Sequence, residues 1–537
     1  MKEGVAAKAF RVAGLFLVVA LLTIFGPADA AEVTLRLKGG GFQLTGELKQ
    51  YDTTKYVIEN KNFGTMTLDA ARFDCIGPGC PRTPYAAPAA LSLAGSRSRT
   101  IRIHGSDVIG AELMPLLVQG YAASIGAKAV KAVGANPLEM QIRLTDATES
   151  EIATIDLQRY GTDQAIAGLA NGTVQIVMAD RPVTDEEVAL LANGGLSNIR
   201  SAPHEHVIAL DGLVIVVSED NPAVSISIEN IAKIFAGEVT DWSEIGLPPA
   251  PIKVYATETR SGTFRVFDAL VLQPRNLTLT RAAQIVATNS EVSDAVARDP
   301  NGIGLTSFAF LRNAKAINVE SSCGLITRPS IFNVKTEEYP LTRRIYLYSG
   351  ILTQPHARGL IDYIFSPAAQ SQIAAAQFVE QSPDFLGFED QGGRIAYALN
   401  APAEDFDMGQ MRQLISDLNG ARRLSITFRF KLGSVELDAR AQSDIERLIE
   451  LIRTPELRGK RILLLGFADS IGQFASNSTL SQRRAAQVQN TLLAAARNTV
   501  NPALLANKGY SELAPVACND TPEGRNLNRR VEVWVRE

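Results

Sequence analysis

The chain has 537 residues, which at roughly 150 residues per domain predicts between three and four domains. Hydrophobic residues make up 46% of the chain and charged residues 20%, a composition that excludes a largely disordered protein. The 53 basic and 57 acidic residues leave a net charge of −4. This balance provides no basic field for nucleic acid or for an anionic membrane surface, so we expect neither as a partner.

Residues 1–30 have the pattern of an export signal. Basic residues precede an apolar stretch from Val12 to Phe25, and a run of small residues follows it and ends at Ala30 and Ala31. The apolar stretch has about 14 residues, fewer than the ~20 that span a bilayer. We therefore expect the signal to be removed and the mature chain to have no transmembrane span. A retained anchor is the alternative.

Residues 32–80 contain short runs of alternating apolar and polar side chains, separated by glycine-rich or polar turns. This pattern is typical of a small antiparallel β domain, and it weakly resembles SH3-like and Sm-like barrels. Cys75 and Cys80 enclose Ile-Gly-Pro-Gly, whose glycines and proline allow the sharp reversal of a short disulfide, so we expect this pair to be bonded. Residues 81–98, rich in Pro, Ala and Ser, are expected to be a linker.

Between residues 99 and 392, β-like runs alternate with helical segments, which predicts an α/β domain large enough for two lobes. In residues 104–107, 161–163 and 260–263, Gly is combined with Ser or Thr where a strand should give way to a helix. The amides at such helix starts can face an anion. Each segment alone is better explained as an ordinary helix cap, and it is the presence of three in one domain that favours an anion site.

The same domain resembles the phosphate-binding periplasmic proteins of ABC importers. The resemblance rests on short motifs in the same order, among them Gly105-Ser106, Ala179–Pro182, Ser261–Thr263 and Tyr339–Arg344. It implies two α/β lobes that close on a small oxyanion, with phosphate as the expected ligand. The anion-binding residues expected on this basis are Ser106, Asp107, Thr162, Arg181, Arg260, Ser261, Gly262 and Thr263.

One departure from that family concerns charge. The family usually has an arginine four residues before the Ser of Ser-Gly-Thr and a glycine directly before it, whereas this chain has Thr257 and Arg260. Arg260 or Arg181 could supply the missing charge. The alternative is a binding fold that has lost its ligand.

Residues 393–422 are expected to form a linker and one helix, and residues 423–537 a compact α/β sandwich of strands and helices. This last part closely resembles the OmpA-like peptidoglycan-binding domain through Gly466–Gly472, Leu480–Ala485 and Asn528–Val531. Diaminopimelate in wall peptides ends in an ammonium and a carboxylate. The resemblance pairs the ammonium with Asp469 and the carboxylate with Arg484, whose planar fork can bind bidentately, and it adds Asn477 and Arg529 as second-rank candidates.

Taken together, these patterns predict a multidomain protein of mixed α/β and α+β class, exported and non-catalytic. We expect it in the periplasm of a Gram-negative bacterium, associated with the cell wall and outer membrane. One alternative is the substrate-binding component of a phosphate ABC importer, with a permease as partner; another is a structural envelope protein. We expect no cofactor and no metal, because His204-Glu205-His206 lacks a matching third ligand. Cys323 and Cys518 could pair or stay free.

Overall fold

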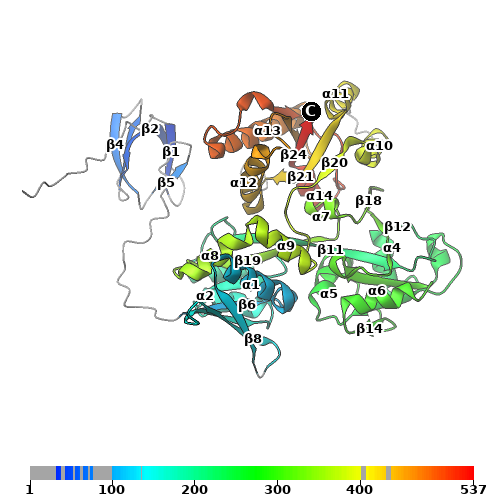
Figure 1. Cartoon of the computed structure of the whole chain (residues 1–537). Helices are drawn as coiled ribbons and strands as arrows, with labels where there is room; N and C mark the ends of the chain where they lie inside the picture. The colour runs from blue at the N-terminus through cyan, green and yellow to red at the C-terminus, as the bar shows by residue number, and fades with distance from the viewer. Residues whose placement is uncertain are drawn as a thin grey trace, which may run out of the picture. The chain divides into compact units, whose positions relative to one another are not determined.

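The computed structural model describes residues 32–37, 43–51, 55–60, 64–70, 73–76, 99–134, 136–400, 407–430 and 437–536. The expected export signal lies outside these residues. The chain divides into two compact units, residues 1–96 and 97–537 (Figure 1). None of the helices in the described ranges combines the length and the apolar character needed to cross a bilayer.

The first unit contains a five-stranded antiparallel sheet, as its alternating sequence predicts. Its strands are β1 (Glu32–Leu37), β2 (Gln43–Tyr51), β3 (Lys55–Asn60), β4 (Gly64–Asp69) and β5 (Phe73–Ile76), in the order β4-β3-β2-β1-β5. Val33, Leu35, Leu44 and Ile58 form its buried core. Cys75 takes part in a disulfide, and Cys80, its expected partner, lies outside the described residues.

The middle part of the second unit has two α/β lobes, as the sequence predicts. Lobe 1 contains β6 (Thr100–Gly105), β7 (Lys128–Val133), β8 (Glu139–Thr145), β9 (Glu151–Gln158) and β10 (Ile176–Ala179), with α1 (Met114–Ser124), α2 (Thr162–Ala170), α3 (Asp185–Asn193), α8 (Pro355–Ile364) and α9 (Pro367–Ala375). Lobe 2 contains β13 (Lys253–Thr257), β14 (Gln284–Val286) and β15 (Gly302–Ser307), with α4 (Ile228–Ala236), α5 (Gly262–Phe267) and α6 (Asn289–Ala297). A small sheet of β12 (Ser225–Ser227), β17 (Asn318–Glu320) and β18 (Ile326–Thr327), the short β16 (Lys315–Ala316) and helix α7 (Ile331–Lys335) complete this part.

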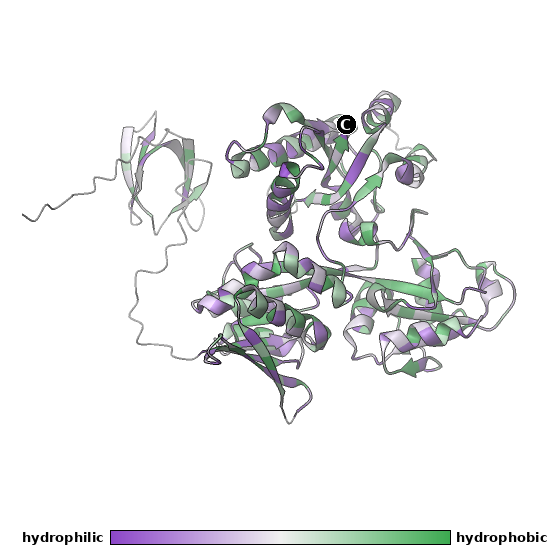
Figure 2. Ribbon diagram, viewed as in Figure 1, coloured by the Kyte–Doolittle hydropathy of each residue, from purple (hydrophilic) through white to green (hydrophobic). Residues whose placement is uncertain are grey.

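Two long strands connect the lobes. β11 (Glu205–Val217) pairs with β19 (Thr342–Ser349) up to Gly212 and with β15 from Leu213 onward. β11 is buried along most of its length, and Figure 2 shows its hydrophobic character. Asp211 and Arg343 form a buried ion pair at this crossover (2.7 Å). β11 therefore passes from lobe 1 into lobe 2 without a break.

The C-terminal part is built on a sheet in the order β20-β21-β24-β22-β23. Its strands are β20 (Phe385–Gly387), β21 (Ala421–Arg429), β22 (Arg461–Phe467), β23 (Leu505–Gly509) and β24 (Arg530–Arg536), and its helices are α10 (Gly392–Asn400), α11 (Met408–Leu418), α12 (Ala439–Arg453), α13 (Phe474–Ala496) and α14 (Pro522–Asn528). Two features differ from expectation. β20 pairs with β21 of this sheet, although its residues lie within 99–392, the range expected for the middle domain. Residues 393–422 contain parts of two helices, α10 and α11, where one helix was expected.

A disulfide joins the middle and C-terminal parts. Cys323 and Cys518, whose pairing the sequence left open, are bonded, with a Cα–Cα distance of 5.7 Å. Beside it, Ser322 Oγ donates a hydrogen bond to Asp520 (2.8 Å). The bond connects residues 195 positions apart in the chain.

Buried ion pairs also lie where the middle and C-terminal parts meet, a region called the joint below. Glu337, between α7 and β19, accepts hydrogen bonds from Arg344 and from Arg440 of α12 (2.6 Å), and it pairs with Arg429 of β21 (3.3 Å). Burial alone would raise the pKa of Glu337, but the three guanidinium groups hold it well below its usual range.

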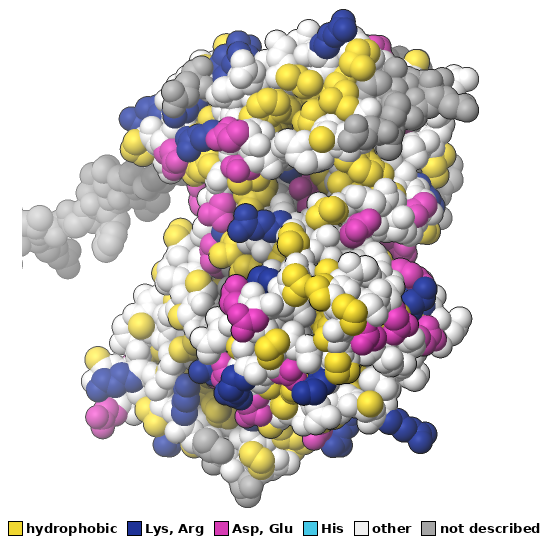
Figure 3. All heavy atoms as spheres, turned by 90° about the vertical axis from the view of Figure 1, so that its right-hand side faces the viewer, with side chains coloured by type: hydrophobic (Ala, Val, Ile, Leu, Met, Phe, Trp, Pro, Cys, Tyr) yellow, Lys and Arg dark blue, Asp and Glu magenta, His cyan; other side chains and the backbone are white. Residues whose placement is uncertain are grey.

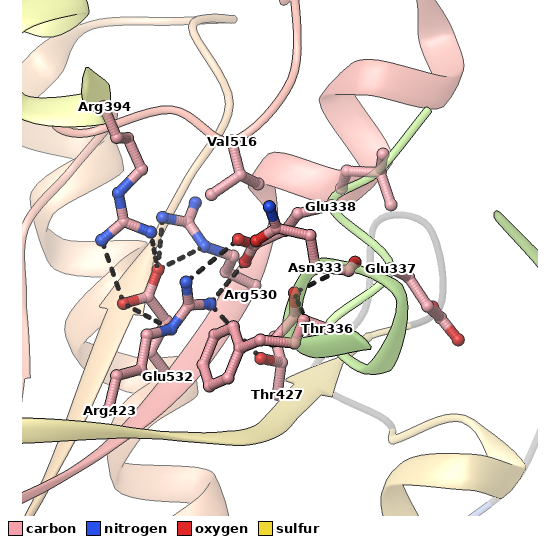
Figure 4. A network of polar contacts seen from close by, with 12 residues as sticks. Asn333, Thr336, Glu337, Glu338, Arg394, Arg423, Thr427, Val516, Arg530 and Glu532 are labelled. Atoms are coloured by element: carbon pink, nitrogen blue, oxygen red, sulfur yellow. Dashed lines mark hydrogen bonds and ion pairs between the residues drawn. The ribbon is translucent and has the colours of Figure 1, made fainter. Parts of the chain in front are cut away.

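A second set of ion pairs continues this network into the C-terminal sheet. Arg423 of β21 pairs with Glu338, and Figure 4 shows Arg394, Arg423 and Arg530 directed toward Glu532. On the outer face drawn in Figure 3, by contrast, acidic and basic side chains are interspersed, in line with the small net charge. The joint thus contains buried charges that are paired with one another, together with a covalent bond, and removal of one partner would leave the other charge buried and uncompensated.

Candidate functional site

Three helix starts meet at one cleft of about 850 Å³, lined by residues of both lobes. A helix begins at Asp107 directly after β6, α2 begins at Thr162 after Gly161, and α5 begins at Gly262. At the last of these, Ser261 is the N-cap and its hydroxyl accepts a hydrogen bond from the Phe264 amide (3.2 Å). These are the three Gly-Ser/Thr segments that the sequence analysis selected, and they expose amides and hydroxyls to the same space.

Buried hydroxyl groups add to the cleft's polar lining. Ser106, Thr162 and Thr263 are all buried and all line it. The hydroxyls of Thr257 and Ser261 are hydrogen-bonded to each other (2.6 Å). Because a hydroxyl both donates and accepts, this lining can adapt to a ligand made of oxygen atoms.

Asp180 is a cleft residue to which the sequence analysis gave no role. It follows β10 in the Ala179–Pro182 motif, and its Oδ1 accepts a hydrogen bond from the Thr162 hydroxyl (3.1 Å). A Cβ added at Gly262 would lie 2.8 Å from Asp180 Oδ2 and 2.6 Å from Val108 Cγ2. Glycine at position 262 therefore lets the two lobes approach each other at the cleft.

The C-terminal part brings its four predicted residues into one buried cluster. Asp469 follows β22, Asn477 and Arg484 lie on α13, and Arg529 precedes β24. Arg529 Nη1 donates to Asp469 Oδ2 (2.6 Å), and the Ile471 amide donates to Oδ1 (3.0 Å). Asn477 Nδ2 donates to the Asp469 carbonyl (3.0 Å). The loop that carries the acid is therefore fixed from two sides.

Two family models match separate parts of this chain. Residues 122–368 match the PBP superfamily domain, and residues 429–529 match the OmpA family. These two regions are called the PBP domain and the OmpA domain after the models that they match. The two matches correspond to the two-lobed part and to the C-terminal sheet with its helices, as the sequence analysis predicted.

Relatives of each domain are known. The protein SphX of Synechococcus elongatus is 32% identical over 200 residues, which is 35% of this chain and 57% of SphX. The phosphate-binding protein PstS of Staphylococcus saprophyticus is 24% identical over 276 residues, which is 49% of this chain and 84% of PstS. Outer membrane porin F of Pseudomonas fluorescens is 33% identical over 113 residues, which is 21% of this chain and 33% of the porin. The chain thus spans only part of SphX and of the porin.

The arginines of the PBP domain are placed differently from expectation. Arg181 does not line the cleft: it pairs with Glu187 (2.7 Å) and with Asp163, and the hydrogen bond to Glu187 is the main reason that its pKa is raised. Arg260 does line the cleft, but its side chain is 89% exposed. Arg159, which the sequence analysis did not single out, also lines it. The only sequence signal for Arg159 is its position three residues before Thr162.

Arg484 of the OmpA domain is a buried cation with spare hydrogen-bonding capacity. Its guanidinium carbon lies 5.4 Å from the centre of the Phe430 ring. Its Nε and one terminal nitrogen have no hydrogen-bond partner among the described residues. Burial lowers its pKa and the nearby charge of Arg529 lowers it further, while Asp469 opposes both. Asn477 Nδ2 also donates to Glu512 (2.9 Å), so the cluster contains two acids and two arginines. The unpartnered donors of Arg484 are the feature of this cluster that suits an anionic group.

In the described part of the chain, no group of three or more His, Cys, Asp or Glu side chains is arranged to hold a metal ion. His204 and His206 instead contact Ser349: His204 Nδ1 lies 2.9 Å from its carbonyl oxygen, and His206 Nε2 lies 3.0 Å from its hydroxyl.

Proposed function

We propose that this protein is an exported, non-catalytic binding protein of the bacterial envelope. Its PBP domain captures a small oxyanion, in first place phosphate, and its OmpA domain retains it on peptidoglycan. The observation that carries the first part is the convergence of three helix starts and the buried hydroxyls of Ser106, Thr162 and Thr263 on one cleft. The similarity to PstS, a phosphate-binding protein, supports the choice of ligand.

The acid in the cleft favours an oxyanion that carries a proton. An ionised carboxylate only accepts hydrogen bonds, and Asp180 lies beside the hydroxyl of Thr162 and the start of α5. At neutral pH phosphate retains a hydroxyl that can donate to such a carboxylate, whereas sulfate does not. We therefore expect the cleft to prefer phosphate to sulfate.

Titration calorimetry of the mature chain with phosphate and with sulfate tests this function. We expect phosphate to bind, sulfate to bind more weakly, and Ser261→Ala to weaken phosphate binding about tenfold or more, since a hydrogen bond to a charged group contributes about 1.5–3 kcal/mol. Arg181→Gln is the control and should bind like the wild type, because Arg181 lies outside the cleft. No heat with either anion would contradict the proposal and favour a structural envelope protein.

The OmpA domain supports the second part of the proposal. Arg484, with its spare donors, can bind a carboxylate, and Asp469 can bind an ammonium group. Diaminopimelate carries both groups on one side chain. This proposal places the protein at the peptidoglycan layer of the periplasm, near the outer membrane.

A second candidate is the substrate-binding component of a phosphate ABC importer, with a permease as partner. It is favoured by the match to PstS, which spans 84% of that protein's length. An importer component must deliver its ligand, so loss of phosphate uptake in cells that lack this protein would favour this candidate over simple capture.

A further inference from the structure

The cleft of the PBP domain contains one cation that is mostly buried. Of the described arginines that line it, Arg260 is 89% exposed, Arg265 is 51% exposed and Arg159 is 16% exposed. An exposed guanidinium is screened by water and contributes little to binding, whereas a buried one interacts strongly with an anion. Because Thr257 carries no charge, the charge that meets a bound oxyanion must come from another position.

Arg159 is held in place by three separate contacts. It directly follows β9, one terminal nitrogen donates to the Pro137 carbonyl, and the other pairs with Asp107. A Cβ added at Gly110 would lie 2.7 Å from Arg159 Cγ and 2.9 Å from Cδ. Glycine at this position therefore leaves room for the aliphatic part of Arg159. Gly110 lies in a π-helical turn (Ile109–Leu113), a feature often found at functional sites.

The guanidinium of Arg159 still has donors to offer. It carries five N–H groups. Among the described residues, Asp107 and Pro137 accept from its two terminal nitrogens, and its Nε has no partner. An arginine held along its stem loses little freedom when it binds an anion. This arrangement fits a planar cation prepared to bind a tetrahedral oxyanion.

We propose that Arg159, from lobe 1, is the charge-bearing residue of the anion site, and that Asp107 competes with the ligand for it. This inference rests on the proposed function and assigns a residue to its site. Both side chains line the cleft and pair with each other. An arriving oxyanion must share or replace the Asp107 carboxylate on the guanidinium. Asp107 therefore lowers the affinity of the cleft for the oxyanion, whereas Arg159 raises it.

Calorimetry of the mature chain with inorganic phosphate tests the assignment. We expect Arg159→Gln to weaken binding at least tenfold, and Arg159→Lys to weaken it less because it keeps the charge but loses the fork. Asp107→Asn should strengthen binding several-fold, because it removes the competing charge. Gly110→Ala should weaken binding although the charge remains, because the stem is displaced. Arg143→Gln, at an exposed position of β8 outside the cleft lining, is the matched control and should change affinity by less than about threefold.

The outcomes separate this inference from the proposed function. If the wild type does not bind phosphate, the proposed function fails. If the wild type binds and Arg159→Gln binds equally well, the function stands and the role of Arg159 is overturned. Circular dichroism checks that each variant is folded. Should Arg159→Gln not fold, Asp107→Asn decides: stronger binding supports the assignment, and unchanged or weaker binding overturns it.

Discussion

Replacing Glu337 with glutamine is expected to lower the free energy of unfolding by about 3–5 kcal/mol, the range for removing one partner of a buried ion pair. The carboxylate is buried and faces the guanidinium groups of Arg344, Arg429 and Arg440. Glutamine would remove the carboxylate that the three guanidinium groups share. Arg344 would keep Asp438 (2.9 Å) and Arg440 would keep Asp444 (3.8 Å), but the repulsion among the three cations would lose its main compensation. Urea unfolding followed by fluorescence measures the change.

The matched control is Glu229→Gln. Glu229 also pairs with an arginine, Arg275 (3.1 Å), but its side chain is 55% exposed. Exposed ion pairs contribute about 0–1 kcal/mol, so this variant should unfold almost like the wild type. Equal effects of the two substitutions would contradict the role of Glu337 in the joint.

The effect of Glu337→Gln should also depend on pH. The pKa of Glu337 lies below its ordinary value of 4.5 in the folded protein. The unfolded chain therefore takes up a proton before the folded one does as the pH falls. The stabilisation is complete above about pH 4.5 and decreases as the pH falls toward the folded value. The difference in stability between wild type and variant should accordingly be constant near neutral pH and shrink under acid conditions.

Replacing Arg484 with methionine is expected to abolish retention on peptidoglycan while leaving the fold as stable as before, or more stable. Arg484 is buried, and burial lowers its pKa, which means that the charged form is disfavoured there. Two of its nitrogens lack partners among the described residues. An apolar side chain of similar length removes this cost, as has been found for other buried charges. The same substitution removes the guanidinium group that we propose to bind the carboxylate of the wall peptide.

Sedimentation with purified peptidoglycan and thermal unfolding measure the two effects. The matched control is Arg483→Met, one residue earlier on α13, whose side chain is exposed. This variant should sediment like the wild type. Sedimentation of Arg484→Met with the wall at the wild-type level would refute the proposed site, and a large fall in its melting temperature would show that Arg484 has a structural role instead.

Local sequence patterns predicted most of the fold. The helix at Ala439–Arg453 has a clear local signal, because Asp438 caps it and its apolar residues recur at helical spacing. The start of α13 at Phe474 has no such signal, because the first turns of this helix contain small and polar residues without an apolar period. β20 was missed because three residues are too few to show alternation.

The residues of the candidate sites were likewise predicted where the sequence signal is local and missed where it is not. Ser106, Thr162 and Ser261 were found because glycine with serine or threonine at a helix start is a local signal. Arg181 was expected at the cleft but pairs with Glu187 outside it, whereas Arg159, for which no role was expected, lines the cleft beside Asp107. The position of a long side chain depends on partners elsewhere in the chain, and Asp107 and Glu187 are not recognisable as those partners from sequence. The buried charges of the joint were missed for a related reason, because arginine and glutamate are rarely buried unless they are paired.

The bond between Cys323 and Cys518 closes a covalent ring that contains the backbone connection between the PBP and OmpA domains. A protease that cuts the chain once inside this ring opens the ring but does not divide the molecule. Separation of the ligand-binding part from the anchoring part then requires a reductant as well, which an oxidising compartment does not supply. The protein should therefore survive a single nick at this connection with both of its parts still on one molecule.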